Sequence, residues 1–425
     1  MVEPRRVRVG VIGAGGRHGR FHMDMVLALR DELELAVLCE RDRARLAAAA
    51  ACAGPEVRAT RRIREVLREA PDMVIVATPT HQGAPVCEAL LEAGIPVLTE
   101  VPPAYCDARA RRMLEIAEQK QVPFGAFENY VFTPIEQLKQ QAIQAGVFGR
   151  IQCADIAGSV SHKGHEVAVA RGYLPDGAQP VRARALGFGI VPHASEGIEI
   201  PATLSGSVEF DCGSEVRFFF SGWDPRGPHV PIGGLRRDFF GTQGGYWDGR
   251  FQLGTPDHPS GLRQIPLRTE VREVDSSPVL QELVLESDHP ICWKSPFASR
   301  PLPWAEQLPS FQHVDATPRA WEIACAELLL DMANAVRTRS SPRYSVQRSM
   351  ADVRIRLAML ESARRAGTWV RWEETLPIEE ELARTGLREL LKRFDFRPLP
   401  TVTRQSPSIP HVGVHLSRDE PSSRS

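Results

Sequence analysis

A glycine-rich loop near the N-terminus constrains the fold of this chain more than any other feature. The strand-like run Val7–Ile12 leads into a helical pattern through three spaced glycines, Gly13, Gly15 and Gly19. Glycines let a backbone turn tightly and approach a pyrophosphate, and a helix N-terminus offers unpaired N–H donors. The context predicts a dinucleotide-binding loop, and its G-x-G-x-x-x-G spacing is one residue longer than usual.

The rest of residues 1–125 extends this pattern. Short β-branched runs alternate with helical stretches, which is the rhythm of a parallel sheet. The runs are 7–12, 35–38, 73–77 and 96–98, and the helical stretches are 20–30, 43–53, 63–69, 83–92 and 108–121. This part is predicted to be an α/β domain with the doubly wound parallel sheet of a Rossmann fold.

Residues 126–397 follow a different rhythm, which predicts an α+β domain with a large open, mainly antiparallel sheet. A helix is expected over 133–145, and strands are expected at 151–157, 207–210 and 216–220. The Gly- and Pro-rich stretch 225–266 is predicted to form long loops with short strands, and 296–318 a connector. Helical periodicity returns at 319–338 and 346–366, and the second of these helices is expected to pack back on the first domain. The polar tail 398–425 is predicted to be disordered.

Composition excludes several classes of protein. The 52 Lys and Arg residues balance 53 Asp and Glu residues, so no basic field favours nucleic acid or an anionic membrane. Eight cysteines without a C-x-x-C pair, together with a start that lacks a signal-peptide pattern, predict reduced thiols in the cytoplasm. His162, His165 and Glu166 match no strong zinc signature, so no metal site is predicted.

The acidic residue expected about 20 positions after the glycine loop is Glu40, which follows the second strand. A carboxylate there accepts hydrogen bonds from the adenosine ribose and favours NAD. Arg41 and Arg43 follow directly and could instead hold the 2′-phosphate of NADP. The residues leave the choice between NAD and NADP open.

Several further segments resemble the Gfo/Idh/MocA family, which includes glucose-fructose oxidoreductase and inositol dehydrogenase. The resemblance runs in order from about residue 7 to about residue 372. The segments that carry it are 72–81 (DMVIVATPTH), 89–102 (ALLEAGIPVLTEVP), 128–130 (ENY), 144–151 (QAGVFGRI), 240–245 (FGTQGG), 344–348 (YSVQR) and 361–365 (ESARR).

The resemblance implies a Rossmann domain, a substrate pocket on an open sheet, NAD(P) binding, and a homo-oligomer, a dimer or a tetramer, formed through the sheet face. With the glycine loop, it predicts the residues that contact the cofactor. These are Gly13, Gly15, Gly16, Arg17, His18, Gly19, Glu40, Arg41, Thr78, Pro79, His81, Glu100, Pro102 and Asn129.

The chain departs from the family at the expected catalytic residues. Val101 stands where the family pattern Glu-Lys-Pro has a lysine that hydrogen-bonds the reacting oxygen. The family's Asp-x-x-x-His is best matched by residues 161–165, which keep His165 and replace the aspartate with Ser161. The resemblance therefore predicts His165 as the acid or base, assisted by Lys163 or Tyr130. Positioned acids and bases typically contribute about 10² to 10⁴-fold to a proton transfer.

Three functions are compatible with these features. The leading hypothesis is an NAD(P)-dependent oxidoreductase acting by hydride transfer on a sugar, a polyol or a related carbonyl or imine metabolite. A second is a non-redox enzyme that uses tightly bound NAD for elimination, epimerisation or glycoside cleavage. The third is a nucleotide-binding regulator or partner protein without catalytic activity.

Overall fold

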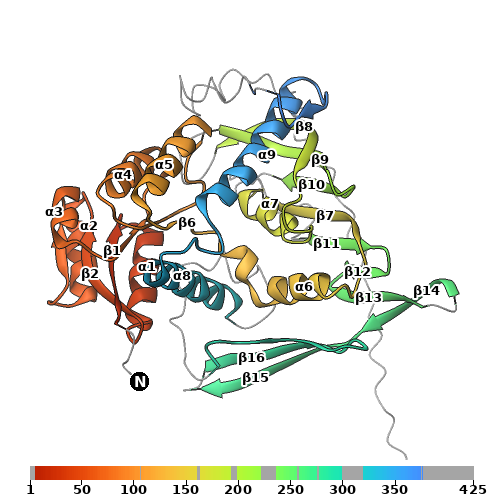
Figure 1. Cartoon of the computed structure of the whole chain (residues 1–425), viewed down its shortest axis with the longest axis horizontal. Coiled ribbons are helices and arrows are strands. Elements are labelled where there is room, and N and C mark those ends of the chain that lie inside the picture. The colour runs from red at the N-terminus through yellow and green to blue at the C-terminus, as the bar shows by residue number, and fades with distance from the viewer. Residues whose placement is uncertain are drawn as a thin grey trace, which may run out of the picture.

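The computed structural model describes residues 5–105, 107–159, 163–192, 199–221, 236–255, 258–274, 277–298, 319–374 and 376. The chain forms a parallel α/β domain and a large open sheet, with helices between them (Figure 1).

The first domain is built on six parallel strands. They are β1 (Val7–Ile12), β2 (Leu33–Cys39), β3 (Arg58–Thr60), β4 (Met73–Val76), β5 (Val97–Thr99) and β6 (Phe124–Ala126). The connecting helices are α1 (Arg17–Ala28), α2 (Arg43–Ala53), α3 (Ile63–Glu69), α4 (Thr80–Glu92) and α5 (Asp107–Lys120). The central strands are buried runs of Val and Ile, as expected for a sheet covered on both faces.

The strand order β3-β2-β1-β4-β5-β6 confirms the doubly wound fold. Strand order reverses between β1 and β4, and ligands of such sheets bind beside this switch, outside the carboxyl ends of the strands. The loops that follow β1, β4 and β5 therefore border the expected cofactor crevice. The short strands β3 and β6 were not predicted; unlike the equally short β5, neither contains an apolar β-branched residue.

The second sheet has nine strands in the part of the chain that the structure describes, in the order β14-β13-β12-β11-β7-β10-β9-β8-β18. Its strands are β7 (Ile151–Ser159), β8 (Pro180–Pro192), β9 (Glu199–Phe210), β10 (Glu215–Ser221), β11 (Arg236–Gly241), β12 (Gly244–Trp247), β13 (Arg250–Thr255), β14 (His258–Ile265) and β18 (Val370–Arg371). The pairing is antiparallel except between β10 and β7. Strands occupy more of the Gly- and Pro-rich stretch than predicted, because its glycines allow tight turns and close backbone approaches between short strands.

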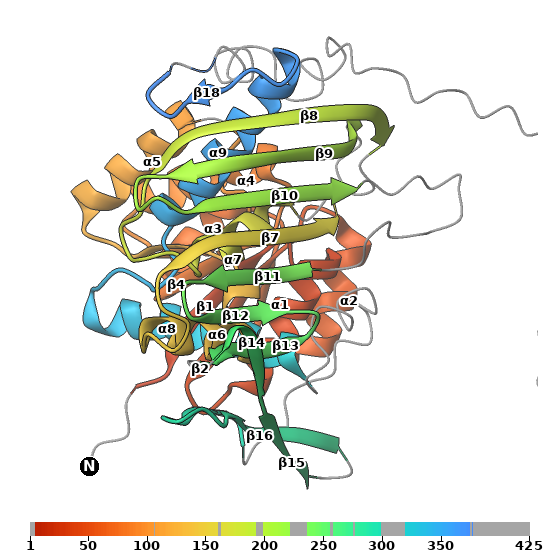
Figure 2. The same cartoon turned by 90° about the vertical axis from the view of Figure 1, so that its right-hand side faces the viewer.

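Helices lie on one face of this sheet only. They are α6 (Pro134–Gln144), α7 (Lys163–Arg171), α8 (Ala320–Thr338) and α9 (Val346–Arg364), and the single-turn helix η1 (Tyr130–Phe132) precedes α6. The opposite face of the sheet is open in the described part of the chain (Figure 2). A separate three-stranded sheet of β15 (Leu267–Val274), β16 (Ser277–Leu285) and β17 (Ile291–Lys294) projects beside α6.

The C-terminal helices return to the first domain. Gly125 pairs with Ser345, the cap of α9, and the Arg337 guanidinium of α8 donates to the Glu32 carbonyl oxygen at 2.9 Å. Both α8 and the residue that caps α9 thus contact the first domain. The predicted tail 398–425 and most of the predicted connector lie outside the described residues.

Candidate active site

The glycine loop between β1 and α1 requires glycine at specific positions. Gly13 has a φ of +85°, and a Cβ there would lie 2.6 Å from the Ala77 carbonyl oxygen. A Cβ on Gly19 would lie 2.1 Å from the Gly13 carbonyl oxygen. The loop therefore packs backbone against backbone, and only glycine permits this approach. Gly16 is the N-cap residue of α1, so the glycine loop leads directly into the N-terminus of this helix.

Glu40 reaches the same loop from the end of β2. Its carboxylate accepts from the Gly15 amide at 3.1 Å and from the Asp42 amide at 3.0 Å. Glu40 is buried, whereas Arg41 is exposed. The carboxylate therefore borders the loop at the position where a ribose is expected.

The loop after β4 supplies the third side of the crevice. The Thr78 hydroxyl is buried and has no hydrogen-bond partner within the described residues. Pro79 then caps α4, and His81 is exposed on its first turn. An orphaned hydroxyl beside a glycine cradle fits a dinucleotide, because the ligand would complete the hydrogen bonding that the protein leaves open.

Glu100, directly after β5, binds two histidines of α1. Its carboxylate lies 2.6 Å from His22 Nε2 and 3.3 Å from His18 Nδ1. Burial opposes ionisation of Glu100, but the two histidines outweigh it and hold its pKa well below the usual range. The Glu100 charge in turn raises the pKa of His18 above its ordinary value. Hydrogen-bonded positive charge is thus favoured beside the glycine loop.

Val101 and Pro102, the two residues directly after Glu100, carry no proton-transfer group. Val101 is half-buried against the apolar core, and its bond to Pro102 is cis. The Pro102 carbonyl oxygen accepts from the Thr80 hydroxyl at 3.0 Å, which joins this loop to the start of α4.

A second histidine cluster forms where α7 meets η1. His165 Nδ1 lies 2.7 Å and 2.9 Å from the two carboxylate oxygens of Glu128. Glu128 is 2% exposed, and the His165 side chain is 18% exposed. The Tyr130 ring stacks on the imidazole with centroids 4.3 Å apart. Because a carboxylate only accepts, Nδ1 carries a proton in this arrangement and Nε2 is the ring nitrogen left for acid-base chemistry.

Residues 127–130 connect the two clusters. The Phe127 ring contacts the His22 ring edge-on at 4.4 Å, and Glu128 follows it directly. Asn129 is buried, and its amide donates to Cys325 Sγ on α8 at 3.3 Å. The Glu100 charge also acts on Cys325, whose thiol pKa is raised by burial first and by Glu322 and Glu100 next. Both histidine clusters therefore border one region between the first domain, α7 and α8.

Comparison with known proteins gives a match to the first domain. Residues 7–127 match the Gfo/Idh/MocA model, described as an oxidoreductase family with an NAD-binding Rossmann fold. The first domain is thus similar to this family. Inositol 2-dehydrogenase of Corynebacterium glutamicum is 34% identical over 120 residues, which cover 28% of this chain and 35% of that protein. The chain thus matches about a third of the length of this relative.

Solved structures extend the likeness in fold to the second sheet. Levoglucosan dehydrogenase, solved with NADH and levoglucosan, superposes with a TM-score of 0.63 at 18% identity, over 87% of this chain and all of that one. An Agrobacterium radiobacter oxidoreductase, solved with NAD⁺, L-tartaric acid and magnesium, gives 0.62 at 17% identity, over 87% of this chain and 99% of that one. At such identities the likeness establishes the shared fold.

The structure brings together some of the predicted Gfo/Idh/MocA site residues. Gly13, Gly15, Gly16, Gly19 and Glu40 border one crevice, and His18 and Glu100 are in contact. Tyr130 meets His165. The Lys163 side chain, His162 and Ser161 lie outside what the structure describes. The individual roles of all these residues stay predictions.

Sequence reasoning assigned no role to three residues that the structure brings to the candidate site: His22, Glu128 and Arg237. His22 lies four residues after His18 on one helix, so helical spacing could have paired them. Glu128 and Arg237 contact residues far away in the chain and left no local signal. The described residues include no cluster of three or more metal-ligating side chains, and none of their helices is long and apolar enough to cross a membrane.

Proposed function

We propose that this protein is an NAD(P)-dependent oxidoreductase that moves a hydride to or from a small polar metabolite, a sugar, a polyol or a related carbonyl or imine. The observation that carries the proposal is the Glu128–His165 pair, held beside a domain whose loop fits a dinucleotide. The sugar-type ligands named for similar structures support the substrate class.

The proposed chemistry divides between the two domains. When bound, NAD(P) would supply the hydride acceptor for oxidation and the hydride donor for reduction. His165 takes the substrate hydroxyl proton at Nε2 during oxidation and returns it during reduction. Glu128 fixes the imidazole tautomer through Nδ1 and stabilises the imidazolium that forms. Tyr130 stacks on the ring, and burial raises the pKa of its phenol well above its usual value, which favours a packing role over proton transfer.

Val101 narrows the proposed substrate. An isopropyl group neither donates to the reacting oxygen nor stabilises charge on it. A carbon that is already activated, as in an imine or a conjugated system, needs this help less than a simple alcohol does. We therefore place imines and conjugated carbonyl compounds ahead of simple polyols.

Cofactor binding and turnover test the proposal separately. Purified protein is titrated with NAD(H) and NADP(H), and cofactor absorbance is followed over a panel of carbonyl, imine and polyol compounds. We expect binding and a change in absorbance, with turnover reduced about 10² to 10⁴-fold in His165→Gln and Glu128→Gln while cofactor affinity is retained. Absence of both binding and turnover contradicts the proposal.

Val101 also favours a second candidate, a nucleotide-binding protein without turnover, since the family lysine is lost. A protein of this second kind would bind the cofactor and show no turnover. His165→Gln would then change neither cofactor binding nor cofactor absorbance. A non-redox enzyme with tightly held NAD would instead keep cofactor through purification and convert substrate without net change in NADH absorbance.

Between the two cofactors we propose NAD. The family model describes NAD binding, and the Glu40 carboxylate already borders the glycine loop. A carboxylate there repels the 2′-phosphate of NADP. We expect Glu40→Ser to shift the preference towards NADP, because Arg41 and Arg43 remain in place.

We propose the cytoplasm as the location. All seven cysteines that the structure describes are free, including the exposed Cys52 and Cys292. Exposed free thiols fit a reducing compartment.

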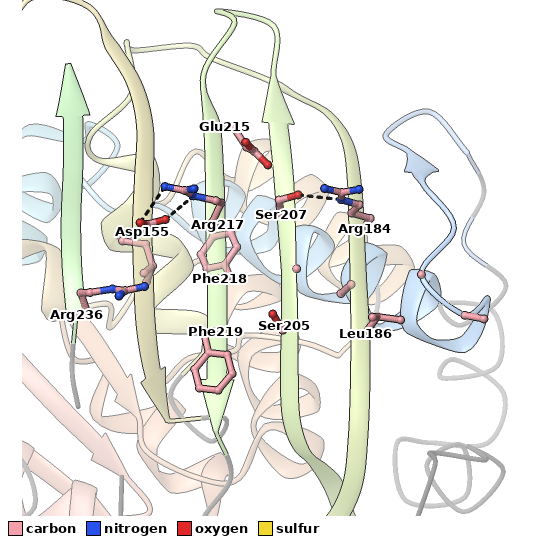
Figure 3. Close-up of a pocket in the computed structure, with 15 residues that line it drawn as sticks. Asp155, Arg184, Leu186, Ser205, Ser207, Glu215, Arg217, Phe218, Phe219 and Arg236 are labelled. Carbon is pink, nitrogen blue, oxygen red and sulfur yellow. Dashed lines mark hydrogen bonds and ion pairs between the residues drawn. The ribbon is translucent and has the colours of Figure 1, made fainter. Parts of the chain in front are cut away.

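We also propose that the open face of the nine-stranded sheet binds a second copy of the chain. The residues Asp238, Asp155, Arg217, Ser207 and Arg184 lie side by side on five adjacent strands. Four of them line a pocket of about 590 Å³ on this face (Figure 3). The row is acidic at one end and basic at the other. A two-fold axis through its centre would place Asp238 of one copy opposite Arg184 of the other.

Charge reversal tests this dimer. We expect a dimer by light scattering, dissociation in Arg184→Asp or Asp238→Arg, and recovery of the dimer when both changes are combined. Like charges facing each other across an interface cost several kcal/mol, so each single variant should be mostly monomeric. Dimers that survive both single changes would exclude this face.

A further inference from the structure

Arg237 is a buried cation one layer behind His165. It lies on β11, and the alternation of the strand directs it towards the helices, whereas its neighbours Arg236 and Asp238 belong to the open face. The residue is 5% exposed. Its guanidinium binds Glu166 of α7 through two hydrogen bonds of 2.9 Å. Glu166 is the residue next to His165, so this bidentate contact fixes α7 at the position of the histidine.

The same guanidinium also lies over the Tyr130 ring, 5.0 Å from its centroid. The Tyr130 ring also stacks on the His165 imidazole, at 4.3 Å between centroids and 17° between the planes. Guanidinium and imidazole thus both contact the Tyr130 ring, and we call these three groups the Arg237 stack. Arginine suits this position because its planar group stacks on a ring and binds a carboxylate at the same time.

The contacts of the Arg237 stack close into a ring. Glu128 binds His165 Nδ1, and the backbone amide of Tyr130 donates to the same Glu128 carboxylate at 3.3 Å. Tyr130 contacts Arg237, Arg237 binds Glu166, and the peptide chain returns from Glu166 to His165. The imidazole is therefore held at its nitrogen by Glu128, on a face by Tyr130, and at its backbone through Glu166.

We propose that Arg237 is a positioning residue that holds the His165 imidazole in the orientation its acid-base role requires, acting through Tyr130 and Glu166. The proposal rests on the proposed role of His165. Arg237 itself stays apart from substrate and cofactor, because it is buried between α7 and the sheet. Stacking fixes the plane of the ring, and Glu128 alone fixes only one of its atoms.

A purely structural role is the competing explanation. Glu136 lies 3.7 Å from the Arg237 guanidinium and also binds Lys139 and Tyr173, so Arg237 belongs to a larger buried cluster. A change at Arg237 could lower stability without altering His165. The test therefore measures a property of the His165 side chain itself and does not depend on turnover.

The readout is the Nδ1 proton of His165 in protein labelled with ¹⁵N-histidine, assigned by its loss in His165→Gln. In the parent protein this proton lies in the bond to Glu128 and should exchange slowly with water. In Arg237→Lys the charge stays but the stacked plane and the fork are lost. We expect exchange to accelerate by roughly tenfold or more. Tyr130→Leu removes the ring between Arg237 and His165 and should have the same effect.

Two variants serve as controls. Tyr130→Phe keeps the ring and should leave the exchange rate unchanged. Arg343→Lys alters a second guanidinium that lies over an aromatic ring of the same η1 helix, Phe132, at 4.4 Å, and it should also have no effect. If Arg237→Lys does not fold, as judged by circular dichroism, Tyr130→Leu decides the question.

Unchanged exchange in Tyr130→Leu, or in a folded Arg237→Lys, overturns the proposal. This outcome differs from failure of the proposed function, which is absence of cofactor binding and turnover in the parent protein. Once a substrate is found, Arg237→Lys should lower kcat roughly tenfold and leave KM near its parent value, because positioning acts on the chemical step.

Discussion

The two halves of the molecule hold their polar groups in place by different means. The Rossmann half relies on backbone geometry: Gly13 and Gly19 let loop and helix meet closely. The sheet half relies on buried charged side chains, among which Glu128 and Arg237 are at most 5% exposed. We therefore expect an added methyl group to have its largest effect in the Rossmann half. Loss of a single charge should have its largest effect in the sheet half.

The two histidine clusters show the same difference. Glu100 binds one buried and one half-exposed histidine, His22 and His18, so its surroundings respond to the pH of the solvent. Glu128 and its histidine are shielded by Tyr130 and α7. The first cluster suits a site that must attract and release a charged cofactor, and the second suits a group that must keep one orientation.

Loss of a buried charge should give the largest effect. Lys139 is 2% exposed and donates to Glu136, to Tyr173 and to the Arg237 carbonyl oxygen. Lys139→Met leaves Glu136 less compensated, and removing one partner of a buried pair costs about 3 to 5 kcal/mol. Denaturant unfolding measures this loss.

The exposed pair Arg182–Glu209 on β8 and β9 provides the matched control for Lys139→Met. Arg182→Met should cost far less stability than Lys139→Met, because water replaces the lost partner. Equal losses in the two variants would contradict the claim that the sheet half depends on its buried charges.

An added methyl group in the glycine loop should give the next largest effect. In Gly19→Ala the new Cβ would lie 2.1 Å from the Gly13 carbonyl oxygen, so the loop must move. We expect NAD affinity to fall by roughly 100-fold or more, about 2.7 kcal/mol, in a calorimetric titration. Gly254→Ala on β13 is the control, since its Cβ meets only an ordinary contact of 3.6 Å. If Gly19→Ala binds NAD with the affinity of the parent protein, the glycine loop does not contribute to cofactor binding.

The Rossmann half was largely predictable from the sequence, because its signals are local. Glycines at fixed spacing, a strand before them and Glu40 after the second strand lie within one βαβ unit. The predicted strand 35–38 is extended by the structure to Leu33–Cys39. Only the short strands β3 and β6 were not predicted, since neither contains an apolar β-branched residue.

The candidate site of the sheet half was less predictable, because its contacts join distant residues. Glu128 and His165 are 37 positions apart, and Glu166 and Arg237 are 71 apart. In a single sequence, nothing distinguishes a charged residue that is buried against a distant partner from an ordinary surface residue. His165 was found through a family resemblance, and neither Glu128 nor Arg237 was assigned a role.

A smaller effect should follow from a carboxylate on the open sheet face. Asp238 lies directly opposite Asp155, and burial, the main cause, raises its pKa to about 6. The folded state therefore holds a proton that the unfolded state has released, so the Asp238 contribution to stability falls as pH rises from about 4 to about 6. Asp238→Asn should stabilise the dilute monomer by about 1 to 2 kcal/mol at pH 7 and change little at pH 4. Equal effects at both pH values would contradict this pKa.

The smallest effect concerns His18 in the cofactor half. The charge of Glu100 raises its pKa above 6.5, so the folded state favours the imidazolium. This stabilisation is complete below pH 6.5 and disappears as pH rises through the folded pKa. His18→Gln should therefore destabilise the protein at pH 6 by less than about 1 kcal/mol, because His18 is half-exposed, and should have no effect at pH 9. His289→Gln, at an exposed position on the distant three-stranded sheet, is the control in the same thermal unfolding series. If His18→Gln instead destabilises equally at both pH values, the His18–Glu100 contact acts by packing and not by charge, and the cofactor half would depend on backbone geometry alone.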